Sequence, residues 1–170
     1  MIDHFKMFAG YNSWANGKLY NAAGKLSDND YDSDCAVAFS SMHGTLNHLL
    51  GGDMIWMSRF RGTVAPSISL DTILHQTFEA LRTARFAYDR EIEDFVDGLD
   101  PAALDKTISY TPITDPRPVT QKLAPAMAHL FNHQTHHRGQ AHAILTRLTG
   151  EAPALDLLYY QRALSDKGNM

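Results

Sequence analysis

The stretch HLFNHQTHHRGQAH, residues 129–142, contains five of the nine histidines in this chain of 170 residues. His133 and His137 are four residues apart, so in a helix they lie one turn apart on the same face. Two imidazoles at this spacing can bind one divalent cation. The alternative is that they are hydrogen-bonded or solvent-exposed histidines that bind no metal.

The direction in which each histidine points bears on this choice. At about 100° per residue, His137 lies about 40° around the helix from His133. The apolar residues of the same arc are Ala126, Leu130, Ala141, Ile144 and Leu148. Such an arc faces the core of a bundle, so we expect both side chains to point inward. His142, about 180° away, is expected to be solvated, and His129 and His136 lie at the edges of the arc.

A catalytic metal site generally takes a third protein ligand and leaves one position open for water or substrate. The candidates elsewhere in the chain are His4, His43, His48, His75 and carboxylates such as Asp53. His43 and His48 lie on different arcs of one helix, and periodicity does not choose between them. Asp53 lies about 140° from His48 around that helix, so we expect a solvated or capping carboxylate there.

Four long segments repeat apolar residues at steps of three and four, the period of an amphipathic helix. We expect helices over residues 2–26, over residues 39–61 before a stop at Gly62, over residues 70–99, and from about residue 122 to a stop at Gly150. Residues 107–120, TISYTPITDPRPVT, predict a short irregular hairpin, and residues 152–164 predict a short closing helix. The expected fold is therefore all-α: a four-helix bundle in one domain, residues 1–170, with the hairpin between its third and fourth helices.

Composition excludes several classes of function. A net charge of −4 with scattered basic residues offers no basic stripe, so we expect no nucleic-acid partner. No apolar run approaches the roughly 20 residues of a membrane helix, so no membrane association is expected. The sequence has no phosphate-binding Gly-rich loop, CxxC pair or Gly-x-Ser-x-Gly elbow. The single Cys35, expected to be a buried or incidental thiol, and the start MIDHFKMFAG, unlike a secretory signal, predict a cytoplasmic protein.

Four sequence blocks resemble those of the DinB family, in that family's order: YNSWANGKLYNAAGKL at 11–26, LNHLLGGDMIWMSRF at 46–60, NHQTHHRGQAH at 132–142 and DLLYYQRAL at 156–164. The resemblance covers nearly the whole chain. It implies an up-down-down-up four-helix bundle that binds a divalent metal through one histidine of the second helix and two of the fourth. At the matching positions these are His48, His133 and His137. Zinc or nickel is the expected metal, and iron(II) also accepts imidazole ligands.

The resemblance implies an activity similar to that of the family's transferases and isomerases, which use low-molecular-weight thiols. It also implies a homodimer. We therefore expect a homodimeric metalloenzyme that activates a small thiol or water for transfer or hydrolysis, with a small-molecule substrate. No catalytic residue beyond the metal ligands is expected. The alternative is a non-catalytic, stress-related metal-binding or sensor bundle.

Other polar and aromatic residues near the motif have simpler interpretations. Gln140 could line a pocket, but we expect a polar residue at the edge of the core. Arg138 is expected to form a surface ion pair, and Gly139 to allow a close helix contact. We expect the aromatic residues at helical spacing to be ordinary core residues. The alternative is that they form an aromatic wall beside the metal site. These residues are Tyr11, Trp14, Trp56, Tyr159 and Tyr160.

Overall fold

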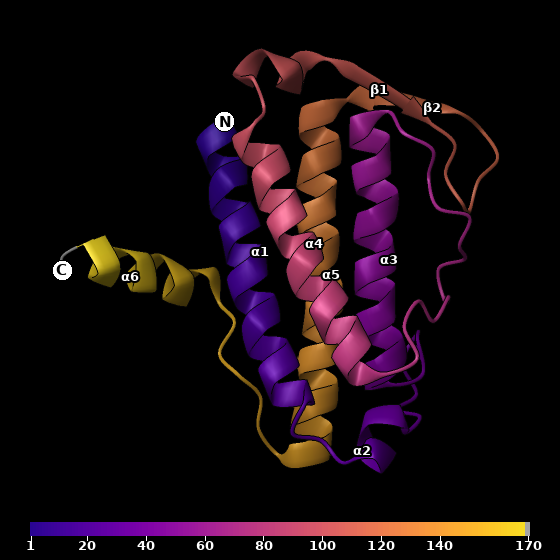
Figure 1. The fold of residues 1–170 in the computed structure, drawn as a ribbon, viewed down its shortest axis with the longest axis vertical. Coiled ribbons are helices and arrows are strands. Elements are labelled where there is room, and N and C mark those ends of the chain that lie inside the picture. Colours follow the sequence, from indigo (N-terminus) through magenta and orange to yellow (C-terminus); the bar gives the residue numbers. More distant parts are fainter. Residues whose placement is uncertain (169–170) are drawn as a thin grey trace.

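The computed structural model describes residues 1–168, with the side chains of residues 1–166. Residues 169–170, the end of the predicted domain, lie outside the described residues. Four long helices form the body of the molecule (Figure 1): α1 (Ile2–Ala23), α3 (Met42–Arg61), α4 (Phe78–Asp97) and α5 (Leu123–Thr149). None of the helices in residues 1–168 is both long and apolar enough to cross a membrane.

The four helices surround one core, with α1 packed against α4 and α5, and α3 packed against the same two helices. In Figure 1, α1 and α5 run downward, whereas α3 and α4 both run upward. The parallel pair is possible because residues 62–77 return along the full length of the bundle. The predicted all-α, up-down-down-up bundle is therefore confirmed.

Capping side chains mark the beginnings of α3 and α4, and glycines mark the ends of α3 and α5. The Ser41 hydroxyl accepts a hydrogen bond from Gly44 N at the start of α3, and Thr77 does the same for Ala80 N at the start of α4. The stops predicted at Gly62 and Gly150 are confirmed, since both glycines adopt the left-handed conformation that ends a helix without strain.

The third predicted helix begins eight residues too early. Residues 70–77 are irregular, and only residues 78–97 of the predicted span 70–99 form a helix. The backbone of this segment is bound to α3 instead: His48 contacts the Leu70 carbonyl, and the Asn47 side chain accepts from His75 N. These tertiary hydrogen bonds outweigh the helical spacing of Leu70 and Leu74.

Shorter elements connect or follow the four long helices. They are α2 (Asp28–Asp32), the 3-10 helix η1 (Pro101–Asp105), the strands β1 (Thr107–Tyr110) and β2 (Val119–Lys122), and α6 (Leu157–Gly168). The strands pair antiparallel, with Thr107 opposite Lys122 and Tyr110 opposite Val119, which confirms the hairpin. A closing helix is also confirmed, although it begins at residue 157 instead of residue 152, and it projects from the bundle beside α1 (Figure 1).

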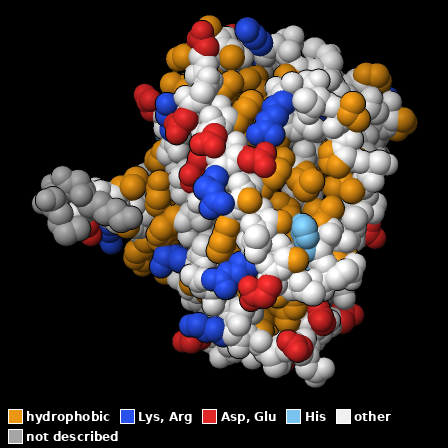
Figure 2. Space-filling view, viewed as in Figure 1, with side chains coloured by type: hydrophobic (Ala, Val, Ile, Leu, Met, Phe, Trp, Pro, Cys, Tyr) orange, Lys and Arg blue, Asp and Glu red, His pale blue; other side chains and the backbone are white. Residues whose placement is uncertain are grey.

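The core has three layers along the helix axes. One apolar cluster lies around Leu46 and Leu81, and a second lies around Phe5 and Leu130 near the opposite end. Between them, the middle turns of all four long helices contribute buried polar side chains: Asn12, Asn16, Asp53, Arg85, Asp89, Gln134 and Arg138. On the outside, acidic and basic side chains are interspersed on the face shown in Figure 2, and apolar side chains gather where α6 leaves the bundle.

Candidate metal centre

The side chains of His48 on α3 and of His133 and His137 on α5 converge between these two helices. Nε2 of His48 lies 3.3 Å from Nε2 of His133 and 3.2 Å from Nε2 of His137. The ligand atoms of all three lie within 4.8 Å of one another. His48 is buried, and His133 and His137 are half-buried. The structure thus brings together the three side chains identified from the sequence.

Hydrogen bonds on the far side of two rings determine which nitrogen faces the centre. His48 Nδ1 lies 2.7 Å from the carbonyl oxygen of Leu70, and His137 Nδ1 lies 2.7 Å from Oε1 of Gln140. Both partners are acceptors, so each Nδ1 carries the proton and each Nε2 presents a lone pair. Two lone pairs 3.2 Å apart repel each other unless a proton or a cation lies between them. This donor set therefore fits a divalent cation.

The three imidazoles are in the charge state that a metal requires. Burial, helped by the neighbouring imidazoles, lowers the pKa of His48 to about 4 and that of His133 to about 3, and at His48 the hydrogen bond to the Leu70 carbonyl opposes this shift. Burial also lowers the pKa of His137, against the hydrogen bond to Gln140. The rings are neutral at pH 7, and a neutral imidazole is the form that coordinates a cation.

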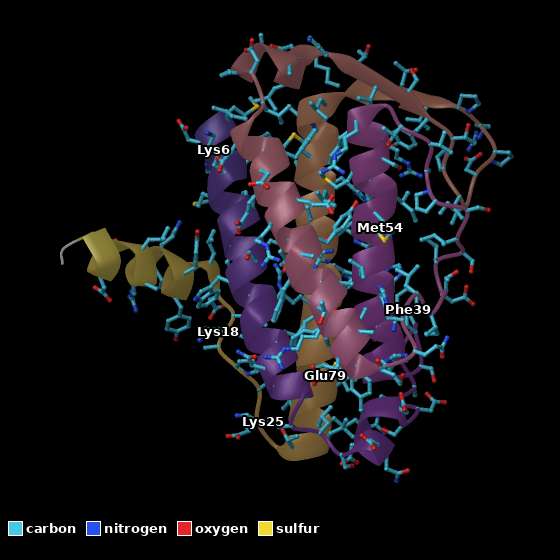
Figure 3. All side chains as sticks on the ribbon, in the orientation of Figure 1. Lys6, Lys18, Lys25, Phe39, Met54 and Glu79 are labelled. Carbon is cyan, nitrogen blue, oxygen red and sulfur yellow. The ribbon has the colours of Figure 1, made fainter. Side chains whose placement is uncertain are left out.

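Packing contacts, in addition to hydrogen bonds, position the imidazole rings of the cluster. His133 Nδ1 is buried and has no hydrogen-bond partner among the described residues. Its ring lies against α3, and a Cβ at Gly52 would lie 2.9 Å from His133 Cε1. Phe39, on the segment before α3 (Figure 3), stacks on His48 with ring centroids 3.7 Å apart. Glycine at position 52 therefore makes room for one ring, and an aromatic face supports another.

A cavity of about 210 Å³ opens beside the cluster. Its walls come from α3, α5, the segment around Leu70 and the hairpin tip at residues 110–114. His48, Gly52, Trp56 and Arg59 supply the α3 side. Arg59 was missed in the sequence, although it lies about 20° from His48 around the helix. The Leu70 carbonyl and Tyr110 were also missed, because their positions depend on loop and hairpin conformation.

The other six histidines are not part of the three-histidine cluster. His4 is exposed on α1, and His75 lies in the 62–77 connection, where its backbone binds Asn47. His43 Nδ1 bonds the Tyr31 hydroxyl 3.0 Å away. His129 and His136 are exposed, as expected at the arc's edges, whereas His142 is half-buried rather than fully solvated. In the part of the chain that the structure describes, no fourth His, Cys, Asp or Glu joins the three histidines.

Asp53 is not the solvated or capping carboxylate that we expected. It is fully buried, 2.7 Å from Nη1 of Arg85, and it accepts a hydrogen bond from Nε2 of Gln134. Arg85 also pairs with Asp89 at 2.8 Å. Burial raises the pKa of Asp53 to about 6 against the attraction of Arg85. The helical angle of Asp53 could not reveal this pair, because its partner lies on another helix.

The expectations for the HRGQ block were wrong for Arg138 and Gly139. Arg138 is buried, and it donates to the side chains of Asn12 and Asn16 instead of forming a surface ion pair. Gly139 is exposed, and a Cβ there would meet nothing within 4 Å, so it allows no close helix contact. Gln140 is half-buried, as expected for a polar residue at the edge of the core, and its Oε1 also accepts a hydrogen bond from His137 Nδ1.

The aromatic residues divide between the site and other places. Trp56 lines the cavity beside the histidines. Tyr11, Trp14 and Tyr160 form a separate cluster where α6 meets α1, with the rings of Trp14 and Tyr160 5.8 Å apart. Tyr159 is exposed, so it is not the core residue that we expected, whereas Cys35 is buried, as expected.

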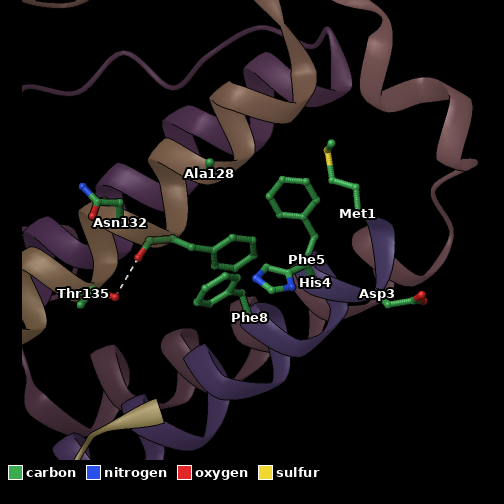
Figure 4. Close-up of a pocket in the computed structure, with 9 residues that line it drawn as sticks. Met1, Asp3, His4, Phe5, Phe8, Ala128, Asn132 and Thr135 are labelled. Carbon is green, nitrogen blue, oxygen red and sulfur yellow. Dashed lines mark hydrogen bonds between the residues drawn. The ribbon is translucent and has the colours of Figure 1, made fainter. Parts of the chain in front are cut away.

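A larger cavity of about 780 Å³ lies between the beginning of α1 and α5 (Figure 4). Its lining is largely aromatic and apolar and includes Phe5, Phe8 and Phe131, and the polar residues Asp3 and His4 also line it. None of the three clustered histidines lines it. Its size therefore does not make it the candidate site, because the groups that could do chemistry lie elsewhere.

Comparison with known proteins supports the resemblance seen in the sequence. The family model of the DinB family matches residues 1–167. Among curated proteins, the chain is similar to Protein DinB of Bacillus subtilis (strain 168), with 28% identity over 156 residues that cover 88% of each chain. Both matches span the helices that carry the three histidines.

Proposed function

The chain belongs to the DinB family, and from this premise we propose that it is a divalent-metal-dependent enzyme acting on a small molecule. His48, His133 and His137 would hold the ion, with zinc or nickel the first candidates and iron(II) the next. The observation that carries the proposal is the meeting of the unprotonated Nε2 atoms of His48 on α3 and His137 on α5, with His133 beside them. Such a pair of facing lone pairs is stabilised by a bound cation.

A divalent ion bound by three neutral imidazoles keeps its full charge, which lowers the pKa of a coordinated thiol or water and makes it a nucleophile at neutral pH. The chain's own residues hold the geometry. The Leu70 carbonyl and Gln140 fix the rings of His48 and His137, and Phe39 packs flat on His48. Trp56 and the hairpin tip line the cavity beside them.

The alternative is a non-catalytic metal-binding or sensor bundle, in which a structural ion is expected to have a closed shell of four protein ligands. Two observations favour the enzyme. Only three histidines meet in the described part of the chain, which leaves a coordination position free. The cavity beside them offers a place for a substrate.

Metal analysis tests the site. Protein purified without a histidine tag is compared with His137→Ala and with His142→Ala, which removes a half-buried histidine of the same helix outside the cluster. We expect about one equivalent of metal in the wild type and in His142→Ala, and a loss of metal in His137→Ala. Equal metal content in all three proteins would show that the three histidines do not form the metal site.

Catalysis is tested separately on metal-loaded protein. Small thiols are offered with electrophilic acceptors, and hydrolysis is followed where no thiol is present. We expect turnover that disappears on chelation and in His137→Ala. If the protein binds the metal but turns over no substrate faster than its metal-free form does, the result would support the non-catalytic sensor bundle.

A further inference from the structure

Arg59 is a cation beside the histidine cluster that forms no ion pair with a carboxylate of the described side chains. Among the residues whose side chains are described, no Asp or Glu oxygen lies within 4.0 Å of its guanidinium, whereas Arg61, two residues on, pairs with Glu91 at 3.2 Å. Arg59 is also half-buried, and burial lowers the pKa of its guanidinium. Such a group is stabilised when an anion binds to it.

Two aromatic rings fix the position of this guanidinium. Its Cζ atom lies 4.5 Å from the ring centroid of Trp56 and 4.2 Å from that of Tyr110. The two rings themselves meet edge to face, with centroids 5.3 Å apart. Cation–π contacts hold the planar guanidinium in place, but the two aromatic rings offer no oxygen acceptor to its five N–H donors. Those donors remain available to a ligand with oxygen acceptors.

Arg59 and the histidines line the same cavity. The Trp56 ring lies 4.7 Å from that of His129, whose ring lies 5.9 Å from that of His133. None of the side chains that line the cavity is a carboxylate. With neutral imidazoles, one arginine and a bound divalent ion, the cavity would carry only positive charge and would attract an anion.

Resting on the proposed function, we propose that Arg59 is the anion-recognition residue of this site and that the substrate is a small carboxylate, with the mercapto acids as the thiol class that fits. The planar guanidinium matches a carboxylate in two parallel hydrogen bonds. The cavity volume of about 210 Å³ lies below the roughly 300–1,000 Å³ of pockets for drug-sized ligands. The ligand is therefore of the size of an amino acid or a short mercapto acid.

The test compares two thiols of equal length, 3-mercaptopropionate and 3-mercapto-1-propanol, on cobalt(II)-loaded protein. Binding of sulfur to cobalt is followed by the thiolate-to-metal absorption band. We expect the wild type to bind the acid about tenfold or more tightly than the alcohol. In Arg59→Gln the two affinities should become nearly equal through loss of affinity for the acid, while Arg61→Gln keeps the wild-type preference.

A preference for the acid that persists in Arg59→Gln would overturn the proposal, because it would come from chelation of the metal alone. Absence of any preference in the wild type would overturn it as well. Equal metal content and thermal stability of Arg59→Gln and the wild type establish that the variant folds and retains its metal site.

A second measurement separates this inference from the proposed function. Butanoate, which has no thiol, is titrated into the protein while the indole N–H signals are followed by NMR. The Trp56 signal should shift in the wild type and not in Arg59→Gln, with Trp14, in its separate cluster with Tyr11 and Tyr160, as the internal reference. This result without any thiol binding would refute thiol activation and retain the carboxylate site. No shift at Trp56 would refute the carboxylate site.

Discussion

The imidazole of His133 occupies the space that a side chain at position 52 would need: a Cβ built on Gly52 lies 2.9 Å from His133 Cε1 and 3.5 Å from Nδ1. The two residues belong to facing helices, α3 and α5. His133 Nδ1 has no hydrogen-bond partner in the described residues, so this contact, rather than a hydrogen bond, sets how closely the ring approaches α3. The absence of a side chain on one helix thus positions a candidate ligand on the other.

Substitution of Gly52 by alanine should therefore weaken metal binding. The added methyl group displaces the His133 ring, and misplacement of a metal ligand through its surroundings typically costs about 10–100-fold in affinity. Competition with a chromogenic chelator measures the effect. Gly51→Ala is the matched control, since its Cβ would meet side-chain atoms of Ile68 and Leu74 only at 3.4 and 3.6 Å. Equal affinity in both variants would show that His133 does not depend on Gly52.

Much of the fold could be predicted because amphipathic periodicity reports which face of a helix is buried. The ends of α3 and α5 could also be predicted, because Gly62 and Gly150 end these helices through their own left-handed backbone conformation. The start of α4 was not. The apolar residues before Thr77 keep helical spacing, and their irregular path depends on hydrogen bonds to Asn47 and His48, far away in the sequence.

The site, like the fold, could be predicted only where the information lies within a single helix. The inward direction of His133 and His137 follows from the arc of one helix, whereas the choice of His48 over His43 came from the family resemblance. Partners that come from other elements left no local signal. Asp53 was judged from its angle on α3, although Arg85 on α4 determines its environment.

Removal of the acceptor for His137 should also lower metal affinity. Gln140 Oε1 lies 2.7 Å from His137 Nδ1 and keeps the Nε2 lone pair directed at the centre. Gln140→Leu leaves the tautomer unfixed, so the dissociation constant for zinc should rise about 10–100-fold. Gln140→Glu keeps an acceptor and adds a negative charge to it, so it should bind zinc at least as tightly as the wild type. Equal loss in both variants would indicate a packing effect instead of a hydrogen bond.

Loss of Arg85 should destabilise the whole bundle. Arg85→Met leaves the carboxylates of Asp53 and Asp89 buried without their cation, and breaking a buried ion pair from one side typically costs about 3–5 kcal/mol. Urea unfolding of metal-free protein at pH 7 measures this cost. Arg90→Met, which changes an exposed arginine of the same helix, should alter stability by about 0.5 kcal/mol or less. A loss for Arg85→Met no larger than that would mean that the buried carboxylates take up protons or water at little cost.

The ionisation of Asp53 should make its contribution to stability decline as the pH rises. Burial, with Asp89 nearby, raises the pKa of Asp53 from 3.8 to about 6 despite the attraction of Arg85. Between these values the folded protein keeps a proton that the unfolded chain has released, so the free energy of unfolding falls with increasing pH until the folded group has ionised. Asp53→Asn removes this titration. The stability of the wild type relative to Asp53→Asn should therefore decrease by about 2 kcal/mol between pH 4 and pH 7.5. Urea unfolding of both metal-free proteins across that range measures the difference, in which the titration of the shared histidines cancels. A relative stability that instead increases with pH would show that the attraction of Arg85 exceeds the cost of burying the carboxylate.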